Sequence, residues 1–172
     1  MFQNPEVALD DLPGTDDLNW ESLDPSFAKA IRIRVAVFFA VLAVAATILT
    51  LILNLPVALS VAIFSVLAIA MVLRLIWPSW SLPRCGYVVR ERDIVFRKGV
   101  VWQSVTAVPF NRIQHVETSS TPLDRKFDLA TLQLFTSGGS GGDLKIDGLG
   151  ADVAETLRVY VLDKAGSAIE RS

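Results

Sequence analysis

The chain has 172 residues, a formal net charge of −2 at pH 7 and 52% hydrophobic residues. Its mean hydropathy of +0.45 is too high for an ordinary soluble domain, and its length allows one or two small folded units. A structural zinc site needs three or four ligands, and the chain has one histidine and one cysteine. We therefore expect no metal, and also no cofactor, no small-molecule substrate and no nucleic acid.

Residues 1–28 are predicted to form an acidic cytosolic tail that is mostly disordered. This segment carries seven acidic side chains, no basic one, and several prolines, a composition typical of disordered chain. One alternative is a partner-binding tail. Another is a helix lying along the membrane surface, because Trp20, Leu23 and Phe27 fall on nearly one helical face.

Two uncharged apolar runs predict a transmembrane helical hairpin within residues 29–80. Each run approaches the roughly 20 residues that cross a bilayer as a helix. The first holds 12 Val, Leu, Ile or Phe residues, which favour insertion by about 4 to 7 kcal/mol. Asn54, Leu55 and Pro56 separate the runs as a turn, so we expect helices at about 33–53 and 57–77. Alanines spaced four apart in both runs allow close packing, either within the hairpin or against another membrane protein.

The basic residues at the open end of the hairpin predict its orientation. The turn at 54–56 carries no charge, whereas Lys and Arg flank both helices at the other end. The positive-inside rule then places both termini in the cytoplasm and the protein in the cell membrane as a multi-pass protein. The expected anchors at headgroup level are Arg32, Arg34, Arg74, Trp77 and Trp80. No ionisable residue lies in mid-membrane, which argues against a transporter, a proton relay or a voltage sensor.

Residues 84–166 change to a period of two, which predicts antiparallel strands with hairpin turns near 92–93 and 98–99. Further strands are expected in "RIQHVET", "TLQLFTS" and "DLKIDG". Helical spacing follows from Asp152, a capping residue, to Gly166, which is expected to end the helix. About six or seven strands closed by one amphipathic helix indicate an α+β protein whose small barrel or sandwich is plugged by that helix. Residues 167–172 form a short tail.

The stretch "VPFNRIQHVETSSTPLDRKFDLATLQLFTSGG", followed by "GDLKIDGL" and the last helix, resembles the membrane-anchored bacterial PH domain proteins, the YdbS-like group. The resemblance covers roughly residues 20–166. It implies a PH-like split β-barrel capped by the C-terminal helix, with no assigned catalytic residue, and it implies a larger relative with several such domains as a possible partner. The sequence departs from the family pattern at Asp128, where glycine is usual, but Asp tolerates a left-handed backbone well.

The candidate chemical sites are weak. His115 could act as a base or a ligand, but it is expected to be a hydrogen-bonded strand residue, sharing one face with Ile113 and Glu117. The "SGGSGGD" segment joins two expected strands instead of feeding a helix, so it is a hairpin connector and not a phosphate loop. Cys85 is expected to be a reduced thiol, with lipidation as the alternative.

A polar surface is the remaining candidate. Asp124, Arg125 and Lys126 are expected to face water in a turn from which Leu123 and Phe127 point inward. Basic side chains near an anionic leaflet contribute about 1 kcal/mol each, which supports non-specific lipid contact. The surface predicted to contact a protein partner or lipid comprises Arg90, Arg92, Arg97, Lys98, Arg112, Asp124, Arg125 and Lys126.

These features favour a non-enzymatic adaptor. The hairpin would fix the domain at the cytoplasmic face, where it binds a membrane-protein partner or a second copy of itself. The alternative is a module that senses anionic lipid or envelope stress. A hydrolase that uses His115 is the least favoured class, because no nucleophile or orienting acid accompanies this residue in the sequence.

Overall fold

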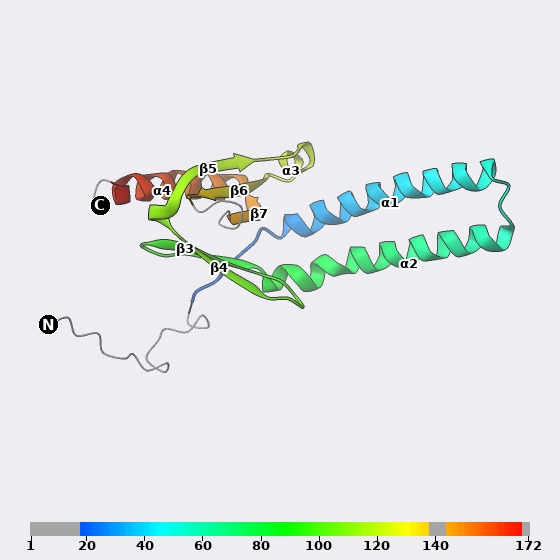
Figure 1. Cartoon of the computed structure of the whole chain (residues 1–172), viewed down its shortest axis with the longest axis horizontal. Helices are drawn as coiled ribbons and strands as arrows, with labels where there is room; N and C mark the ends of the chain where they lie inside the picture. Colours follow the sequence, from blue (N-terminus) through cyan, green and yellow to red (C-terminus); the bar gives the residue numbers. More distant parts are fainter. Residues whose placement is uncertain (1–17, 138–143, 170–172) are drawn as a thin grey trace.

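The computed structural model describes residues 18–137 and 144–169 and shows a long helical hairpin projecting from one end of a small α+β domain (Figure 1). The hairpin consists of α1 (Ser26–Ile52) and α2 (Val57–Ser81). The two-residue strand β1 (Glu21–Ser22) precedes the hairpin. The elements that follow it are, in order, η3 (Leu82–Arg84), β2 (Gly86–Val89), β3 (Asp93–Lys98), β4 (Ser104–Pro109), η4 (Phe110–Arg112), β5 (Ile113–Ser119), α3 (Pro122–Lys126), β6 (Leu129–Thr136), β7 (Leu144–Gly150) and α4 (Ala151–Ile169).

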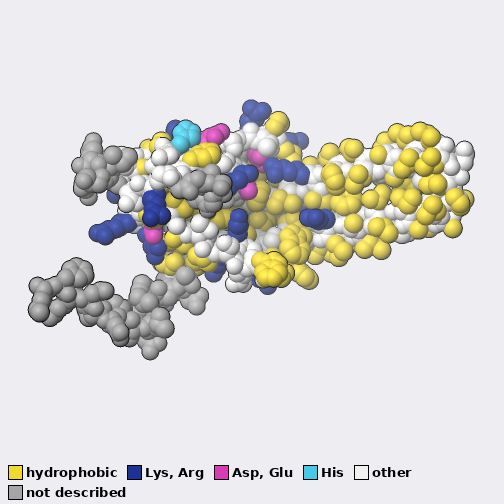
Figure 2. All heavy atoms as spheres, viewed as in Figure 1, with side chains coloured by type: hydrophobic (Ala, Val, Ile, Leu, Met, Phe, Trp, Pro, Cys, Tyr) yellow, Lys and Arg dark blue, Asp and Glu magenta, His cyan; other side chains and the backbone are white. Residues whose placement is uncertain are grey.

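The hairpin has the length and the surface of a membrane-spanning element. Its helices have 27 and 25 residues, or about 40 and 38 Å at 1.5 Å per residue, enough for a hydrocarbon core of about 30 Å. No residue in the most apolar 18-residue window of either helix is buried. Hydrophobic side chains cover the visible face of the hairpin, whereas Lys and Arg lie over the domain and the hairpin base (Figure 2). Such a surface is suited to lipid.

The hairpin confirms the two predicted helices, and both are longer than expected. α1 begins at Ser26 instead of residue 33, and α2 continues through an internal Pro78 to Ser81. The turn between them, which we call the tip, places Asn54 in the left-handed region with φ 48°. Asparagine tolerates this conformation better than most residues, so a tight reversal is possible there.

The domain contains two antiparallel sheets with strand orders β1-β2-β3-β4 and β5-β6-β7. The predicted hairpin turns are present: Arg90 N–H donates to the Asp93 carbonyl at 2.9 Å, and a loop joins Lys98 to its register partner Ser104. The seven strands and the terminal helix agree with the predicted PH-like fold, although the sheets do not close into a barrel. Asp128 takes φ 52°, the left-handed conformation that its replacement of glycine predicted.

Helix α4 packs on the β5-β6-β7 sheet and on η4 (Figure 1), and the core contains residues of this helix and of both sheets. Ile94, Leu132, Ile146 and Val161 come from four different elements, and each is fully buried. α4 continues through Gly166, its predicted end, to Ile169. Residues 138–143, which include most of the predicted glycine-serine connector, lie outside the described residues.

The predicted tail needs correction. Residues 1–17 lie outside the described part of the chain, but the next residues belong to the domain. Glu21 and Ser22 pair with Tyr87 and Gly86 of β2, and Leu23 is buried in the core. Residues 21–23 therefore form neither solvated chain nor a helix on the membrane surface. Its order comes from partners more than sixty residues away in the chain, which no local pattern indicates.

Strand β5 does not keep the predicted alternation. The register between β5 and β6 shifts between Ile113 and His115, so Ile113 and Val116 are both buried whereas His115 is exposed. A bulge places two residues opposite one, which moves the following side chains to the other face. Ile113 and His115 therefore do not share one face, as the alternating pattern had predicted.

Candidate functional site

The hairpin is fixed to the domain at a joint between α1, α3 and β7. At the joint, Arg34 of α1 donates through Nη2 to Oδ1 of Asp124 and, at 3.3 Å, to the hydroxyl of Thr121. Asp124 also forms a capping box, because its Oδ2 accepts from Thr121 N–H at 3.0 Å while Thr121 Oγ1 accepts from Asp124 N–H at 3.2 Å. A buried carboxylate is stable only when its charge is paired and hydrogen-bonded.

Asp124 therefore does not face water, and the prediction from the sequence was wrong for this residue. It is 6% exposed, whereas its neighbours Arg125 and Lys126 are exposed. Leu123 and Phe127 are half-buried, and Leu129 is buried, so the inward side of the turn agrees with the prediction. The difference arises because Arg34, ninety positions earlier, supplies the counter-charge.

A second set of contacts at the joint involves Gly148 of β7. Asp24 N–H donates to the Gly148 carbonyl at 2.9 Å, and the Asp24 carboxylate accepts from Ser26 N–H at 2.7 Å at the start of α1. A Cβ at Gly148 would lie 2.2 Å from Cδ1 of Phe27, and its φ is +76°. Gly148 thus lets the first turn of α1 pack directly on β7.

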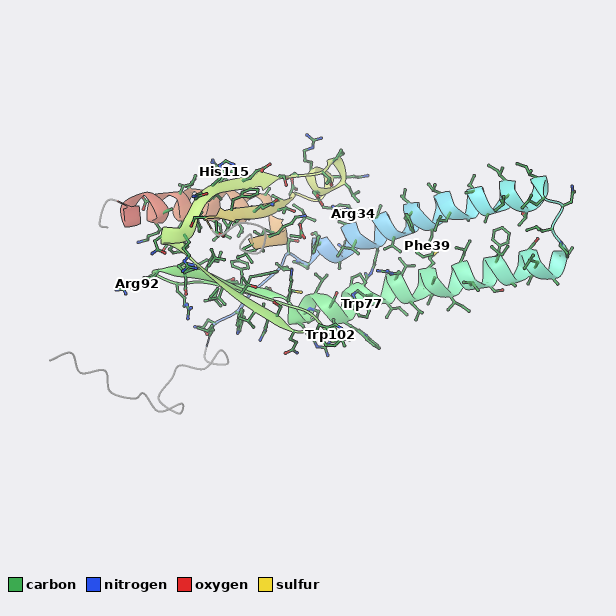
Figure 3. The ribbon with its side chains drawn as sticks, in the orientation of Figure 1. Arg34, Phe39, Trp77, Arg92, Trp102 and His115 are labelled. Carbon is green, nitrogen blue, oxygen red and sulfur yellow. The ribbon has the colours of Figure 1, made fainter. Side chains whose placement is uncertain are left out.

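The predicted anchors surround the base of the hairpin, where α1 begins and α2 ends. Arg32 donates to Ser79 Oγ across the two helices at 2.8 Å, and Arg74, Trp77 and Trp80 are exposed. Between the helices lies a groove of about 910 Å³, open to the surroundings and lined by apolar side chains with Arg34 and Arg74 among them. Figure 3 shows Arg34, Phe39 and Trp77 around it. Among the described residues, Arg74 has no hydrogen bond or ion pair to protein.

The eight residues of the predicted polar surface do not form one surface. In the β3–β4 pair, Asp93 lies opposite Pro109 at one end and Lys98 lies opposite Ser104 at the other. The predicted residues near Asp93 are therefore separated from Lys98 by the length of the strand. We call the end with Arg90, Arg92 and Arg112 the far end, because Arg92 lies away from the hairpin (Figure 3). Lys98 is at the opposite end of β3, and Arg125 and Lys126 are on α3 beside α1.

Two of the predicted surface arginines have partners within the domain. Arg90 forms a two-pronged ion pair with Asp93, with N–O distances of 2.6 and 2.5 Å, and this hydrogen bonding raises the pKa of Arg90. Arg97 places its guanidinium carbon 4.4 Å from the centre of the Trp20 ring, and its Nε is buried. Arg97 therefore packs on Trp20 as a cation–π pair.

The far end continues into the outer face of α4. Arg92 and Arg112 are exposed, and the Arg92 carbonyl accepts from Phe110 N–H at 3.0 Å. Phe110 in turn packs edge to face on Tyr160, with ring centres 6.1 Å apart. Beyond Tyr160, α4 exposes Val159 and Leu162. Basic side chains at the far end and apolar side chains on α4 are thus exposed on elements that pack on one another through η4.

Sequence reasoning missed Val101 and Trp102 in the β3–β4 loop. They fall in the alternating runs predicted around the turn at 98–99 and were not singled out, yet they are 73% and 88% exposed. The available signal was their position directly after Lys98 and Gly99, which were themselves predicted as a turn. Tyr87 was also overlooked: burial, with a smaller effect of Glu21, raises its pKa above the usual 10.0.

The groups proposed for chemistry are isolated. His115 is exposed beside the Phe135 ring at 5.6 Å, and Cys85 is a free thiol whose Sγ lies 3.4 Å from the Ser81 carbonyl. Within residues 18–137 and 144–169, no group of three or more His, Cys, Asp or Glu is arranged to hold a metal ion.

Comparison with known proteins agrees with this architecture. The model of the family described as "Bacterial PH domain" matches residues 30–165, well over half of the chain. The chain is 39% identical over 51 residues to the UPF0699 transmembrane protein YdbS of Bacillus subtilis (strain 168), a match that covers 30% of this chain and about a third (32%) of YdbS.

Among solved structures, the chain is similar to a DUF1696 family protein with a pleckstrin-homology domain from Shewanella loihica PV-4. The identity is 20% and the TM-score 0.38, over 49% of this chain and 73% of that one. The chain belongs to the bacterial PH domain family, and with its two exposed apolar helices it is a membrane protein of that family similar to YdbS.

Proposed function

We propose that the protein is a non-catalytic scaffold that holds its PH-like domain at the cytoplasmic face of the cell membrane and binds a protein partner there. Both ends of the hairpin would then lie in the cytoplasm, as the basic residues at its base favour. The partner class is another membrane protein with a cytosolic part, such as a related protein with several PH-like domains or a second copy of this chain.

The observation that carries this proposal is the joint. A domain on a flexible linker would sample many orientations, whereas Arg34, Phe27 and Asp24 tie this one to the first turns of α1. A fixed domain presents the same surface at a constant height above the bilayer. That property suits a scaffold, because binding then costs little orientational entropy.

The far end and the outer face of α4 are the surface that fits a protein partner best. Val159, Tyr160 and Leu162 provide apolar contact, and Arg92 and Arg112 add positive charge. Mixed apolar and basic patches are typical of protein interfaces. Arg92 in this surface lies away from the hairpin (Figure 3), which favours a protein partner over lipid of the same membrane.

Site-specific photocrosslinking in cells tests the scaffold. A crosslinking residue at Val159 or Arg112 is expected to give one discrete adduct, identified as the same partner from both positions. Reversal of charge at Arg92 and Arg112 should abolish the adduct from Val159, whereas reversal at Arg125 and Lys126 on α3 should leave it unchanged. The absence of a discrete adduct, or equal loss in both charge-reversal variants, would contradict the proposed surface.

A second candidate function, binding of an anionic phospholipid, is favoured by the groove in the hairpin. Arg34 and Arg74 stand where they can reach a lipid phosphate, and Phe38, Phe39 and Leu73 offer an apolar wall for an acyl chain. This site differs from the one expected from the sequence, since Arg90 and Arg97 have partners in the domain and Arg92 is at the far end.

Thermal unfolding of the full chain in mild detergent tests this second candidate. Added phosphatidylglycerol is expected to raise the midpoint more than phosphatidylcholine does. Arg74→Gln should remove the difference between the two lipids. Arg32→Gln, at the same level but bonded to Ser79 outside the groove lining, should preserve it. Equal responses to both lipids in the unmodified chain would eliminate a specific lipid site.

A further inference from the structure

The β3–β4 loop presents an apolar surface that the domain itself does not cover. Val101 and Trp102 are 73% and 88% exposed, and Val105 on the adjoining strand is also exposed. Leaving an indole ring almost fully exposed to water is unfavourable, and a group of neighbouring exposed apolar side chains marks an interaction site.

The loop is built to hold this conformation. Gly99 has φ +113°, and a Cβ at this position would lie only 1.9 Å from the Trp102 carbonyl oxygen. Glycine is therefore required for the chain to turn back under residue 102. At the other side of the turn, Lys98 is exposed, so one cation accompanies the two apolar side chains.

The loop lies at the level of the hairpin base. In Figure 3, Trp102 and Trp77 lie at a similar level along the long axis of the molecule, at the end of the domain that carries the hairpin. Trp77 and Trp80 are the exposed aromatic residues at the end of α2, where indoles prefer the boundary between headgroups and acyl chains. A bilayer that surrounds the hairpin therefore meets the β3–β4 loop at the same depth.

We propose that the β3–β4 loop inserts into the interfacial layer of the bilayer, with Trp102 and Val101 between the acyl chains and headgroups and Lys98 beside the phosphates. The domain would then have a membrane attachment of its own, formed by a strand turn, in addition to the helices. The occupant of this surface is phospholipid, because the loop lies at the same level as Trp77 and carries a cation next to its apolar residues.

The inserted loop and the joint hold the domain at separate points. Arg34 and Phe27 fix it to α1, and the β3–β4 loop would hold the other sheet against the lipid surface. Two separated attachments prevent the domain from pivoting about α1. The inference rests on the hairpin's place in the bilayer and is independent of the protein partner proposed above.

Depth-dependent fluorescence quenching tests the inference on the purified full chain in liposomes. Cys85 is the single cysteine, so a Cys85→Ser background accepts one NBD label at Val101→Cys. The expected result is blue-shifted emission and quenching by lipids brominated near the glycerol, with weaker quenching by lipids brominated at the chain ends. Because no other protein is present, quenching reports lipid contact.

Two comparison labels and two tryptophan substitutions make the outcome decisive. A label at Val44→Cys in the middle of α1 should be quenched by the deep bromines, and a label at exposed His115→Cys should behave as in water. Trp102→Ser should reduce quenching at residue 101 to the level at residue 115, whereas Trp80→Ser should not. A water-like label at 101 beside a quenched label at 44 would overturn loop insertion alone. Water-like labels at both would overturn the hairpin's membrane placement and the loop insertion with it.

Discussion

Arg34 and Asp124 are ninety positions apart in the chain and form an ion pair that joins the hairpin to the domain. The carboxylate is nearly buried and shares its capping box with Thr121, whereas the guanidinium is partly exposed. Pairing of this type does two things at once, since it completes the N-terminus of α3 and sets the direction of α1.

The first prediction concerns this pair. Arg34→Gln leaves a nearly buried carboxylate without its cation, so it should lower the free energy of unfolding by about 1–3 kcal/mol. In a double-mutant cycle with Asp124→Asn, the measured coupling should be about 1–2 kcal/mol. Arg32→Gln, which loses one exposed bond to Ser79, is the matched control and should change stability by less than about 0.5 kcal/mol. Additive effects of the two joint substitutions would contradict the pairing.

The second prediction compares two glycines. Gly148→Ala should destabilise the chain by about 1–3 kcal/mol, because the new Cβ would overlap the Phe27 ring and φ is positive. Gly166→Ala should stabilise it by about 0.5–1 kcal/mol, because this glycine lies inside α4 with nothing within 4 Å of the added atom. Denaturant unfolding measures both, and Phe27→Ala should reduce the cost at Gly148. Equal costs with and without the Phe27 ring would exclude the contact.

The third prediction concerns the pKa of Tyr87, which burial and Glu21 raise above 10.0. The folded state then holds the phenolic proton more tightly than the unfolded chain does. The resulting stability is complete below pH 10 and decreases as the pH rises from 10 through the folded-state pKa. The chain has two tyrosines, so in Tyr160→Phe the tyrosinate absorbance reports Tyr87 alone. Its midpoint should exceed that of the same variant unfolded in denaturant, and Glu21→Gln should lower it. A midpoint at or below that of the unfolded chain would refute the burial.

Local patterns predicted the hairpin and most of the strands. The two apolar runs are long enough to dictate helices whatever surrounds them, and the turn residues at 54–56 limit where the chain reverses. Asp128 is a similar case, because the family's glycine at that position indicated a left-handed backbone, which the structure has. The chain's own chemistry within a few residues determines the helices and the turn, whereas the Asp128 prediction came from the family resemblance.

The parts that sequence reasoning missed depend on distant partners. Leu23 is buried by strands that follow the hairpin, and Asp124 is buried because Arg34 reaches it. Trp20 was assigned to a tail, yet it packs with Arg97. The bulge in β5 altered the faces of Ile113 and His115, and an alternating pattern contains no signal for an inserted residue. The eight predicted surface residues separated into groups at opposite ends of the domain, because their positions depend on how distant strands pair.

The membrane topology decides the central claim most directly. In the Cys85→Ser background, single cysteines at Asn54 on the hairpin tip and at His115 on the domain can be labelled with a membrane-impermeant maleimide in intact spheroplasts. We predict that Asn54→Cys reacts in intact spheroplasts, and that His115→Cys reacts only after permeabilisation. Labelling of His115→Cys without permeabilisation, with Asn54→Cys protected, would contradict a hairpin that holds the PH-like domain on the cytoplasmic side.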